Sequence, residues 1–228
     1  MRNNLLVPLV FGLVGVAVLL SLGKWQLDRL AWKEGILADI EARISAEPVP
    51  LPEEVERPAD RYLPVTVSGR IEPRALRVLV SQKRVGAGYR LISALDTGAR
   101  RVLLDRGFIP VEDDVPAPPQ TPVTVTGNLH WPDDRLESTP ENEIDGNMWF
   151  ARDVARMAEV LGTEPVLVIA REISPPEPGV SPLPVDTVGI PNDHLEYAVT
   201  WFSLAVIWAV MTAILIRRQI RARKEAEA

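Results

Sequence analysis

Residues 5–22 read LLVPLVFGLVGVAVLLSL, a run of 18 residues without a charged side chain. A second uncharged run, AVTWFSLAVIWAVMTAILI, covers the 19 residues 198–216. At a rise of 1.5 Å per residue, helices over these runs would be roughly 27 and 28 Å long, close to the ~30 Å hydrocarbon core of a bilayer. The two runs therefore predict two transmembrane helices and argue against a soluble protein.

A cleavable signal peptide is the alternative interpretation of the first run, because Ser21 and Gly23 offer small residues at a possible cleavage site. The run is, however, longer than the apolar region of about 7–15 residues that signal peptides have, and only Arg2 precedes it as a basic side chain. We therefore expect the first run to be retained as a membrane anchor.

The distribution of charge predicts the topology. Five basic residues follow the second run directly: Arg217, Arg218, Arg221, Arg223 and Lys224. Because basic residues in short segments beside a span favour the cytoplasmic side, both termini are predicted to be cytoplasmic. Basic residues after the first run argue the other way, but acidic residues lie among them, and a long segment is translocated largely regardless of charge. Residues 23–196 are therefore predicted to be periplasmic, in a multi-pass protein of the cell inner membrane.

The middle of the chain is acidic and lacks thiols. Residues 23–196 carry 19 Lys and Arg against 29 Asp and Glu, whereas the whole chain has a net charge of −6. Such an acidic domain argues against a nucleic acid as partner. The chain contains no cysteine, which excludes disulfides, thiol catalysis and cysteine-ligated metal centres.

The segment after the first span is expected to form a helix and then a tether. Trp25, Arg29, Trp32 and Ile36 recur on one helical face, so the helix should continue to Ile44. Four prolines between residues 48 and 58 then favour a non-helical tether. The predicted divisions are the first span with its cytoplasmic end (1–22), the juxtamembrane helix and tether (23–61), a β-rich domain (62–196), the second span (197–216) and a basic cytoplasmic tail (217–228).

Short β-branched runs separated by glycine and proline begin at Tyr62. They predict six strands: Val65–Ile71, Arg77–Gln82, Tyr89–Leu95, Val102–Ile109, Val123–Leu129 and Pro165–Glu172. One amphipathic helix is expected from Asp153 to Leu161, closed by Gly162. The predicted fold class is an α+β membrane protein in which two transmembrane helices flank an extracytoplasmic antiparallel sheet or small barrel with one short helix.

One strand motif occurs twice, as PVTVSG over residues 64–69 and as PVTVTG over residues 122–127. Shared β-propensity is one explanation, because valine and threonine are common in any strand. A duplicated half-domain that pairs around a pseudo-twofold axis is the other. Six residues do not distinguish the two.

Few residues are available for catalysis. The two histidines are His130 and His194, no serine lies in a nucleophile elbow, and Gly86-Ala-Gly88 lacks the third glycine of a dinucleotide-binding loop. His130 and the Asp133-Asp134 pair are expected at the surface. We therefore expect a protein that is not an enzyme.

The strand that ends in Asp105-Arg106-Gly107 is predicted to have a structural role. A glycine inside a strand favours a bulge or a close approach of another backbone segment. Arg106 is expected to pair with a loop carboxylate, such as Asp105 or another.

His194, Tyr197, Trp201 and Trp208 form one stripe on the helix that enters the second span. The stripe places an imidazole at the membrane surface with aromatic rings one and two turns deeper. Such a stripe suits an interfacial aromatic belt, which is the simpler explanation. It also suits a haem or quinone site, which needs an axial nitrogen ligand and flat apolar walls.

The sequence resembles the Surfeit locus protein 1 family, the cytochrome c oxidase assembly factors. Four blocks carry the resemblance: residues 22–33 (LGKWQLDRLAWK), Gly88–Pro110 with its RGFIP ending, Trp149 with Asp153 and Met157-Ala158, and residues 192–202 (NDHLEYAVTWF). Phe108 stands where the family more often has tryptophan. The blocks, their order and the two-span topology cover essentially the whole chain.

The resemblance implies an assembly factor that acts around the haem-bearing large subunit of cytochrome c oxidase. It implies haem a as a transient cofactor, His194 as the candidate iron ligand, and Tyr197 and Trp201 as walls of the haem site. It also marks Trp25, Gln26, Arg29, Arg106 and Gly107 as motif residues with structural roles. The implied partners are membrane lipid, the oxidase large subunit and the haem a synthesis machinery. The alternative is a membrane scaffold that holds an oxidase subunit without binding haem.

Overall fold

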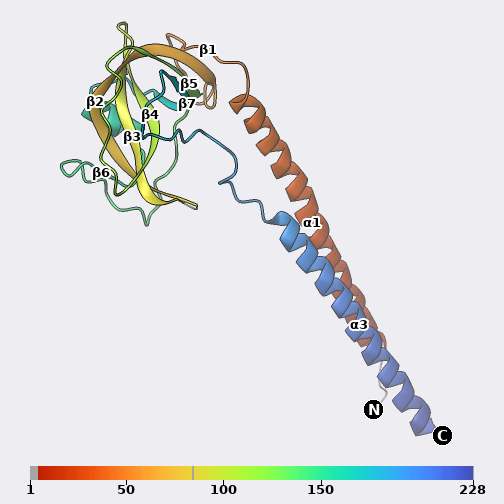
Figure 1. Cartoon of the computed structure of the whole chain (residues 1–228). Coiled ribbons are helices and arrows are strands. Elements are labelled where there is room, and N and C mark those ends of the chain that lie inside the picture. Colours follow the sequence, from red (N-terminus) through yellow and green to blue (C-terminus); the bar gives the residue numbers. More distant parts are fainter. Residues whose placement is uncertain (1–4, 84, 228) are drawn as a thin grey trace. The chain divides into compact units, whose positions relative to one another are not determined.

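The computed structural model describes residues 5–83 and 85–227, so Arg2, the basic residue before the first apolar run, lies outside the described residues. The chain folds as two units (Figure 1). The first unit consists of Met1–Asp39 with Val188–Ala228, and the second is Ile40–Thr187. Each unit is built from segments with a different hydrophobic pattern.

Two long helices make up the first unit. They are α1 (Leu6–Ile44), whose last residues belong to the second unit, and α3 (His194–Glu227). Both are long and apolar enough to cross a membrane. Their apolar side chains are mostly exposed to the surroundings, as expected for helices that face lipid rather than a protein core.

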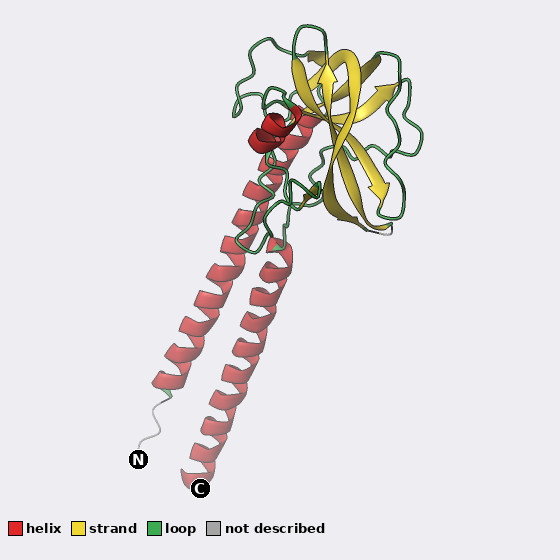
Figure 2. Cartoon of the chain, turned by 90° about the vertical axis from the view of Figure 1, so that its left-hand side faces the viewer, coloured by secondary structure: helices red, strands yellow, loops and turns green. Residues whose placement is uncertain are grey.

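The two helices lie side by side and run in opposite directions (Figures 1 and 2). Glycines on α1 allow the close approach: a Cβ built on Gly12 would lie 2.2 Å from Thr212, and one on Gly15 would lie 2.2 Å from the Trp208 indole nitrogen. Further along, a Cβ on Gly23 would lie 2.6 Å from the Phe202 ring. The small glycine residues of α1 therefore make room for larger side chains of α3 in the helix pair.

The second unit is built on a closed barrel of five strands. The strands are β2 (Pro64–Gln82), β3 (Gly86–Asp96), β4 (Arg101–Pro110), β5 (Val123–Leu129) and β7 (Leu167–Ser174). They pair in the order β2-β3-β4-β7-β5, and β5 returns to pair with β2. Two short strands, β1 (Val49–Pro50) and β6 (Met148–Trp149), add to β2 in parallel. Closure leaves these five strands without a free edge in the ladder.

The barrel differs from the predicted sheet in two respects. The predicted strands Val65–Ile71 and Arg77–Gln82 are one strand, β2, with a register irregularity between Ile71 and Ala75. Pro73 lies exposed at the irregularity, where its missing N–H costs no ladder bond. The sheet is also mixed, because β4 and β7 pair in parallel. The chain between β4 and β7, residues 111–166, contains β5, β6 and α2 (Val154–Leu161) and gives room for this parallel crossover.

The repeated motif has a structural counterpart. The segments 64–69 and 123–128 pair with each other antiparallel, with Val67 opposite Val125 and Thr66 opposite Thr126. The two copies of PVTV are therefore neighbours around a local twofold relation. Pairing of this kind agrees with a duplicated half-domain, although shared β-propensity would allow the same pairing.

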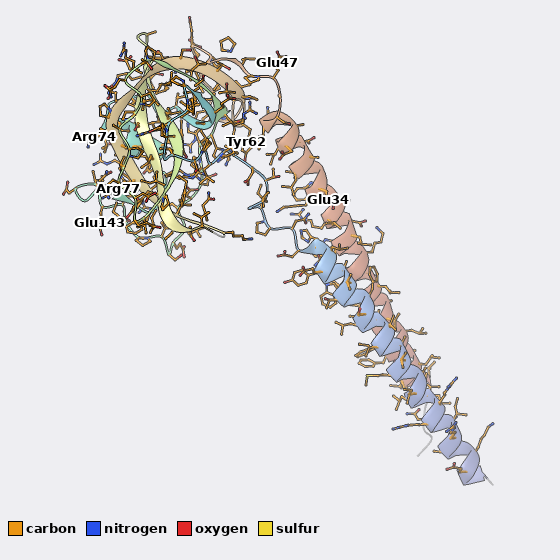
Figure 3. The ribbon with its side chains drawn as sticks, viewed as in Figure 1. Glu34, Glu47, Tyr62, Arg74, Arg77 and Glu143 are labelled. Carbon is orange, nitrogen blue, oxygen red and sulfur yellow. The ribbon has the colours of Figure 1, made fainter. Side chains whose placement is uncertain are left out.

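Buried apolar residues fill the barrel and extend under α2. The helix is fixed at both ends, because the Asp153 side chain accepts a hydrogen bond from Arg156 N and Gly162 closes it in the left-handed conformation. Arg74 of β2, labelled in Figure 3, donates from Nη1 to the Val160 carbonyl oxygen of α2 at 2.9 Å. The short predicted helix thus covers the barrel at the bend of β2.

Candidate functional site

His194 is the first residue of α3 and lies within reach of α1. Its Nδ1 is 2.8 Å from Oε1 of Gln26, and the Gln26 side chain is buried against α3 with 8% of the residue exposed. An amide oxygen only accepts hydrogen bonds, so Nδ1 carries the proton and donates it. In the neutral form of the ring, this bond leaves the lone pair on Nε2, the arrangement of a metal-binding histidine.

Aromatic side chains continue the site along α3. Tyr197 is 56% exposed, and Trp201 is half-buried one turn further along the same face. Both are available to an apolar ligand that enters beside His194. The site of the first unit thus combines one imidazole nitrogen with two aromatic surfaces.

The structure brings together only some of the residues that the sequence singles out. Gln26 contacts His194 directly, whereas the family resemblance implied only a structural role for Gln26. Arg29 does not reach His194, because its guanidinium lies 3.7 Å above the Trp32 ring on the same helix. Trp25 is 56% exposed beside Gln26. No spacing in the sequence links residue 26 to residue 194, so pairing of the two helices was needed to find this contact.

Arg106 lies in the second unit and is buried completely. Its Nε donates to Glu177 Oε2 at 3.0 Å, its Nη2 forms a second bond to the same carboxylate, and Nη2 also donates to the Pro116 carbonyl oxygen at 3.0 Å. Burial lowers the pKa of Arg106 to about 10, which leaves it protonated at neutral pH. The expected carboxylate partner is therefore Glu177 rather than Asp105.

Gly107 meets the same segment through the backbone. Its φ is +128°, and a Cβ built on it would lie 2.2 Å from the Ser181 carbonyl oxygen. The neighbouring Phe108 exchanges two backbone hydrogen bonds with Ser181, at 2.7 and 3.0 Å. Arg106 and Gly107 together fasten the segment that leads from β7 towards α3, which is the close backbone approach that a strand glycine predicts.

A buried charge network was missed by the sequence analysis. Asp105 is inaccessible and pairs with Arg90, and Arg152 lies 3.9 Å from the same carboxylate. Burial raises the pKa of Asp105 in spite of the two guanidinium groups. Arg152 also donates to Asp134 at 2.5 and 3.0 Å, so Asp134 is half-buried and paired rather than exposed at the surface as expected. The available signal was a carboxylate inside an apolar strand, Leu103-Leu104-Asp105.

His130 is half-buried rather than on the surface. Its ring stacks on Tyr62 with the centroids 5.2 Å apart. Burial, together with the nearby Arg152 and Arg61 guanidinium groups, lowers the pKa of His130 to about 4.

This shift predicts a loss of stability in mild acid. An unfolded histidine binds a proton near pH 6.5, while the folded ring stays neutral down to about pH 4. The unfolded chain therefore binds more protons between these two values, and the free energy of unfolding should fall as the pH is lowered through this range. Urea unfolding of the full chain in detergent at pH 7, 6 and 5 measures the fall, and His130→Phe should reduce it. An equal fall in both proteins would contradict the assignment to His130.

Comparison with known proteins shows to which protein family the chain belongs. The sequence model described as "SURF1 family" matches residues 13–206. The chain belongs to the SURF1 family. Among its relatives, Surfeit locus protein 1 of Homo sapiens is 32% identical over 212 residues, which cover 81% of this chain and 69% of the human protein. The mouse protein of the same name is 30% identical with 82% and 69% coverage, and a SURF1-like protein of Drosophila melanogaster is 31% identical with 90% and 74% coverage.

The family match confirms the resemblance seen in the sequence. SURF1 family proteins are known as cytochrome oxidase assembly factors and are generally not enzymes. The matched range includes Gln26, Arg106, Gly107 and His194, so the features described in both units lie within the family's common region.

Proposed function

We propose that this SURF1 family member promotes maturation of cytochrome c oxidase by holding haem a at His194 until the large subunit receives it. The observation that carries the proposal is the hydrogen bond between His194 Nδ1 and Gln26 Oε1. This hydrogen bond fixes the orientation of the ring and leaves Nε2 as the nitrogen that could ligate a metal. In metal-binding histidines, the ring nitrogen that does not bind the metal commonly donates such a hydrogen bond.

The residues around His194 fit a haem. When bound, haem would supply an iron, and His194 would hold it through a neutral imidazole nitrogen. Tyr197 and Trp201 offer flat surfaces on the same helix face, and their position at the start of an apolar helix suits a lipophilic macrocycle. Gln26 would act as a positioning residue, because it orients the imidazole without reaching the iron side of the ring.

A haem a titration of the purified full chain tests the role of Gln26. Gln26→Leu removes the acceptor for Nδ1–H and should weaken haem a binding by about 10- to 100-fold, the usual effect of losing an outer-shell partner. Gln26→Glu keeps an acceptor at the same place and should bind haem a nearly as well as the parent chain. Equal affinities for the leucine variant and the parent would contradict the positioning role.

The alternative proposal is a scaffold that holds an oxidase subunit without touching haem. Its support is the exposed aromatic surface of α1, where Trp25 is 56% and Trp32 is 50% exposed. Exposed tryptophans at a membrane surface suit either lipid headgroups or a partner protein. The haem titration separates the two proposals, because a scaffold would bind no haem a.

We also propose that both termini lie in the cytoplasm and that residues 40–187 lie in the periplasm of a bacterial cell. The basic residues after Ile216 support this orientation. Alkaline phosphatase inserted after Thr121 should therefore be active, and the enzyme fused after the last residue should be inactive. The reverse pattern would place the barrel in the cytoplasm and remove the basis for oxidase maturation on the outer side.

A further inference from the structure

A groove lies between α1 and α3 at the end of the first unit where α1 begins and α3 carries its basic residues. It encloses about 450 Å³. Pro8 and Phe11 line it from α1, and Trp208, Met211, Leu215 and Arg218 line it from α3. The only ionisable side chain among the described residues of this lining is Arg218.

The floor of the groove follows from the packing of the two helices. Trp208 lies against Gly15, where a Cβ would come within 2.2 Å of the indole nitrogen. Phe11 also packs on the indole, with the ring centroids 5.4 Å apart, yet it remains 65% exposed. The two rings therefore form a wide apolar wall that continues towards the end of α3.

The shape of the groove matches an extended hydrocarbon chain. Trp208, Met211, Leu215 and Arg218 recur at intervals of three and four residues, so they form one stripe along α3. Ten residues of helix extend about 15 Å, half of the ~30 Å hydrocarbon core. The stripe is thus about as long as the acyl region of one leaflet.

Arg218 supplies the polar end of the stripe. It is exposed, it directly follows the last apolar turn, and no ion pair joins it to a carboxylate among the side chains described, those of residues 5–83 and 85–225. A guanidinium binds phosphate oxygens through two parallel hydrogen bonds. Because a zwitterionic headgroup carries its own cation beside the phosphate, the positive charge of Arg218 favours a lipid with net negative charge over a zwitterionic one.

We propose that this groove binds one acidic phospholipid, with an acyl chain along Trp208, Met211 and Leu215 and the phosphate on Arg218. The site is separate from His194, which lies at the opposite end of α3. It does not depend on haem binding or on the orientation of the protein in the membrane. A bound lipid of this kind would fill the gap that the two helices leave beside Trp208.

Native mass spectrometry of the full chain in detergent tests the site, with phosphatidylglycerol and phosphatidylcholine of identical acyl chains as probes. We expect one phosphatidylglycerol to be retained about fivefold more strongly than phosphatidylcholine, the effect of roughly one basic residue near a phosphate. Arg218→Gln should abolish this preference. Arg217→Gln removes the same charge from the adjacent residue, which does not line the groove, and should keep most of the preference.

A second variant tests the acyl part of the site. Met211 is 64% exposed, so Met211→Trp can fill the groove without disturbing a buried contact, and it should lower retention of both lipids. Equal retention of the two lipids by the parent chain would overturn the proposal. Equal effects of Arg217→Gln and Arg218→Gln, or unchanged retention by Met211→Trp, would overturn it as well.

Discussion

Replacing Gly107 with glutamate is expected to destabilise the barrel by more than about 4 kcal/mol. The φ of +128° strains any residue with a Cβ, and that Cβ would lie 2.2 Å from the Ser181 carbonyl oxygen. Ser181 is unable to retreat freely, because it exchanges two backbone hydrogen bonds with Phe108. The added carboxylate would also be buried without a partner. Thermal unfolding of the full chain in detergent, followed by circular dichroism, measures the loss.

Gly189→Glu is the matched control, because the same side chain is added where no heavy atom lies within 4 Å of the new Cβ. It should change the free energy of unfolding by no more than about 0.5 kcal/mol. If Gly107→Glu were as stable as this control but failed to support oxidase maturation, Gly107 would belong to a functional surface rather than to the fold.

Removal of the Arg106 charge is expected to cost about 3–5 kcal/mol of folding stability. Arg106→Met leaves Glu177, which is only 8% exposed, as a buried carboxylate without its guanidinium. It also removes a donor from the Pro116 carbonyl oxygen. The segment after β7 should then detach from β4, which limited proteolysis within residues 175–187 would detect.

Two further variants separate the ion pair from simple packing. Arg106→Met combined with Glu177→Met removes both charges and should recover much of the loss, because a buried pair is often replaced by apolar residues at little cost. Arg135→Met breaks an exposed pair with Glu141 and should cost at most about 1 kcal/mol. A loss in Arg106→Met no greater than in Arg135→Met would contradict the fastening role.

Local patterns predicted most elements of the fold. The apolar runs gave both long helices, and the Asp153 cap with Gly162 gave the ends of α2 within one residue. Barrel closure was harder to predict, because β2 pairs with two strands, β3 and β5. No local sequence pattern shows that one strand has both of these partners. The parallel pairing of β4 with β7 depends in the same way on the path of residues 111–166, which add β5 to the barrel before the chain reaches β7.

The candidate site was predictable only in part. The helical period placed His194, Tyr197 and Trp201 on one face, and the family resemblance drew attention to Gln26. The contact between Gln26 and His194 joins residues 168 positions apart, so it requires the packing of α1 on α3. The charge network of Asp105, Arg90 and Arg152 was missed for the same reason, since its members come from three separate segments.

The measurement that tests the proposed function most directly is the haem content of the full chain, purified after co-expression with the haem a synthesis pathway. A pyridine haemochrome spectrum quantifies haem a, and His194→Gln keeps a polar side chain of similar size while removing the imidazole ligand. We predict haem a on the parent chain, and a shifted or lost Soret band with less haem a on the variant. Haem a on His194→Gln at the parent level with an unchanged spectrum would exclude axial ligation by His194, and no haem a on either protein would favour the scaffold.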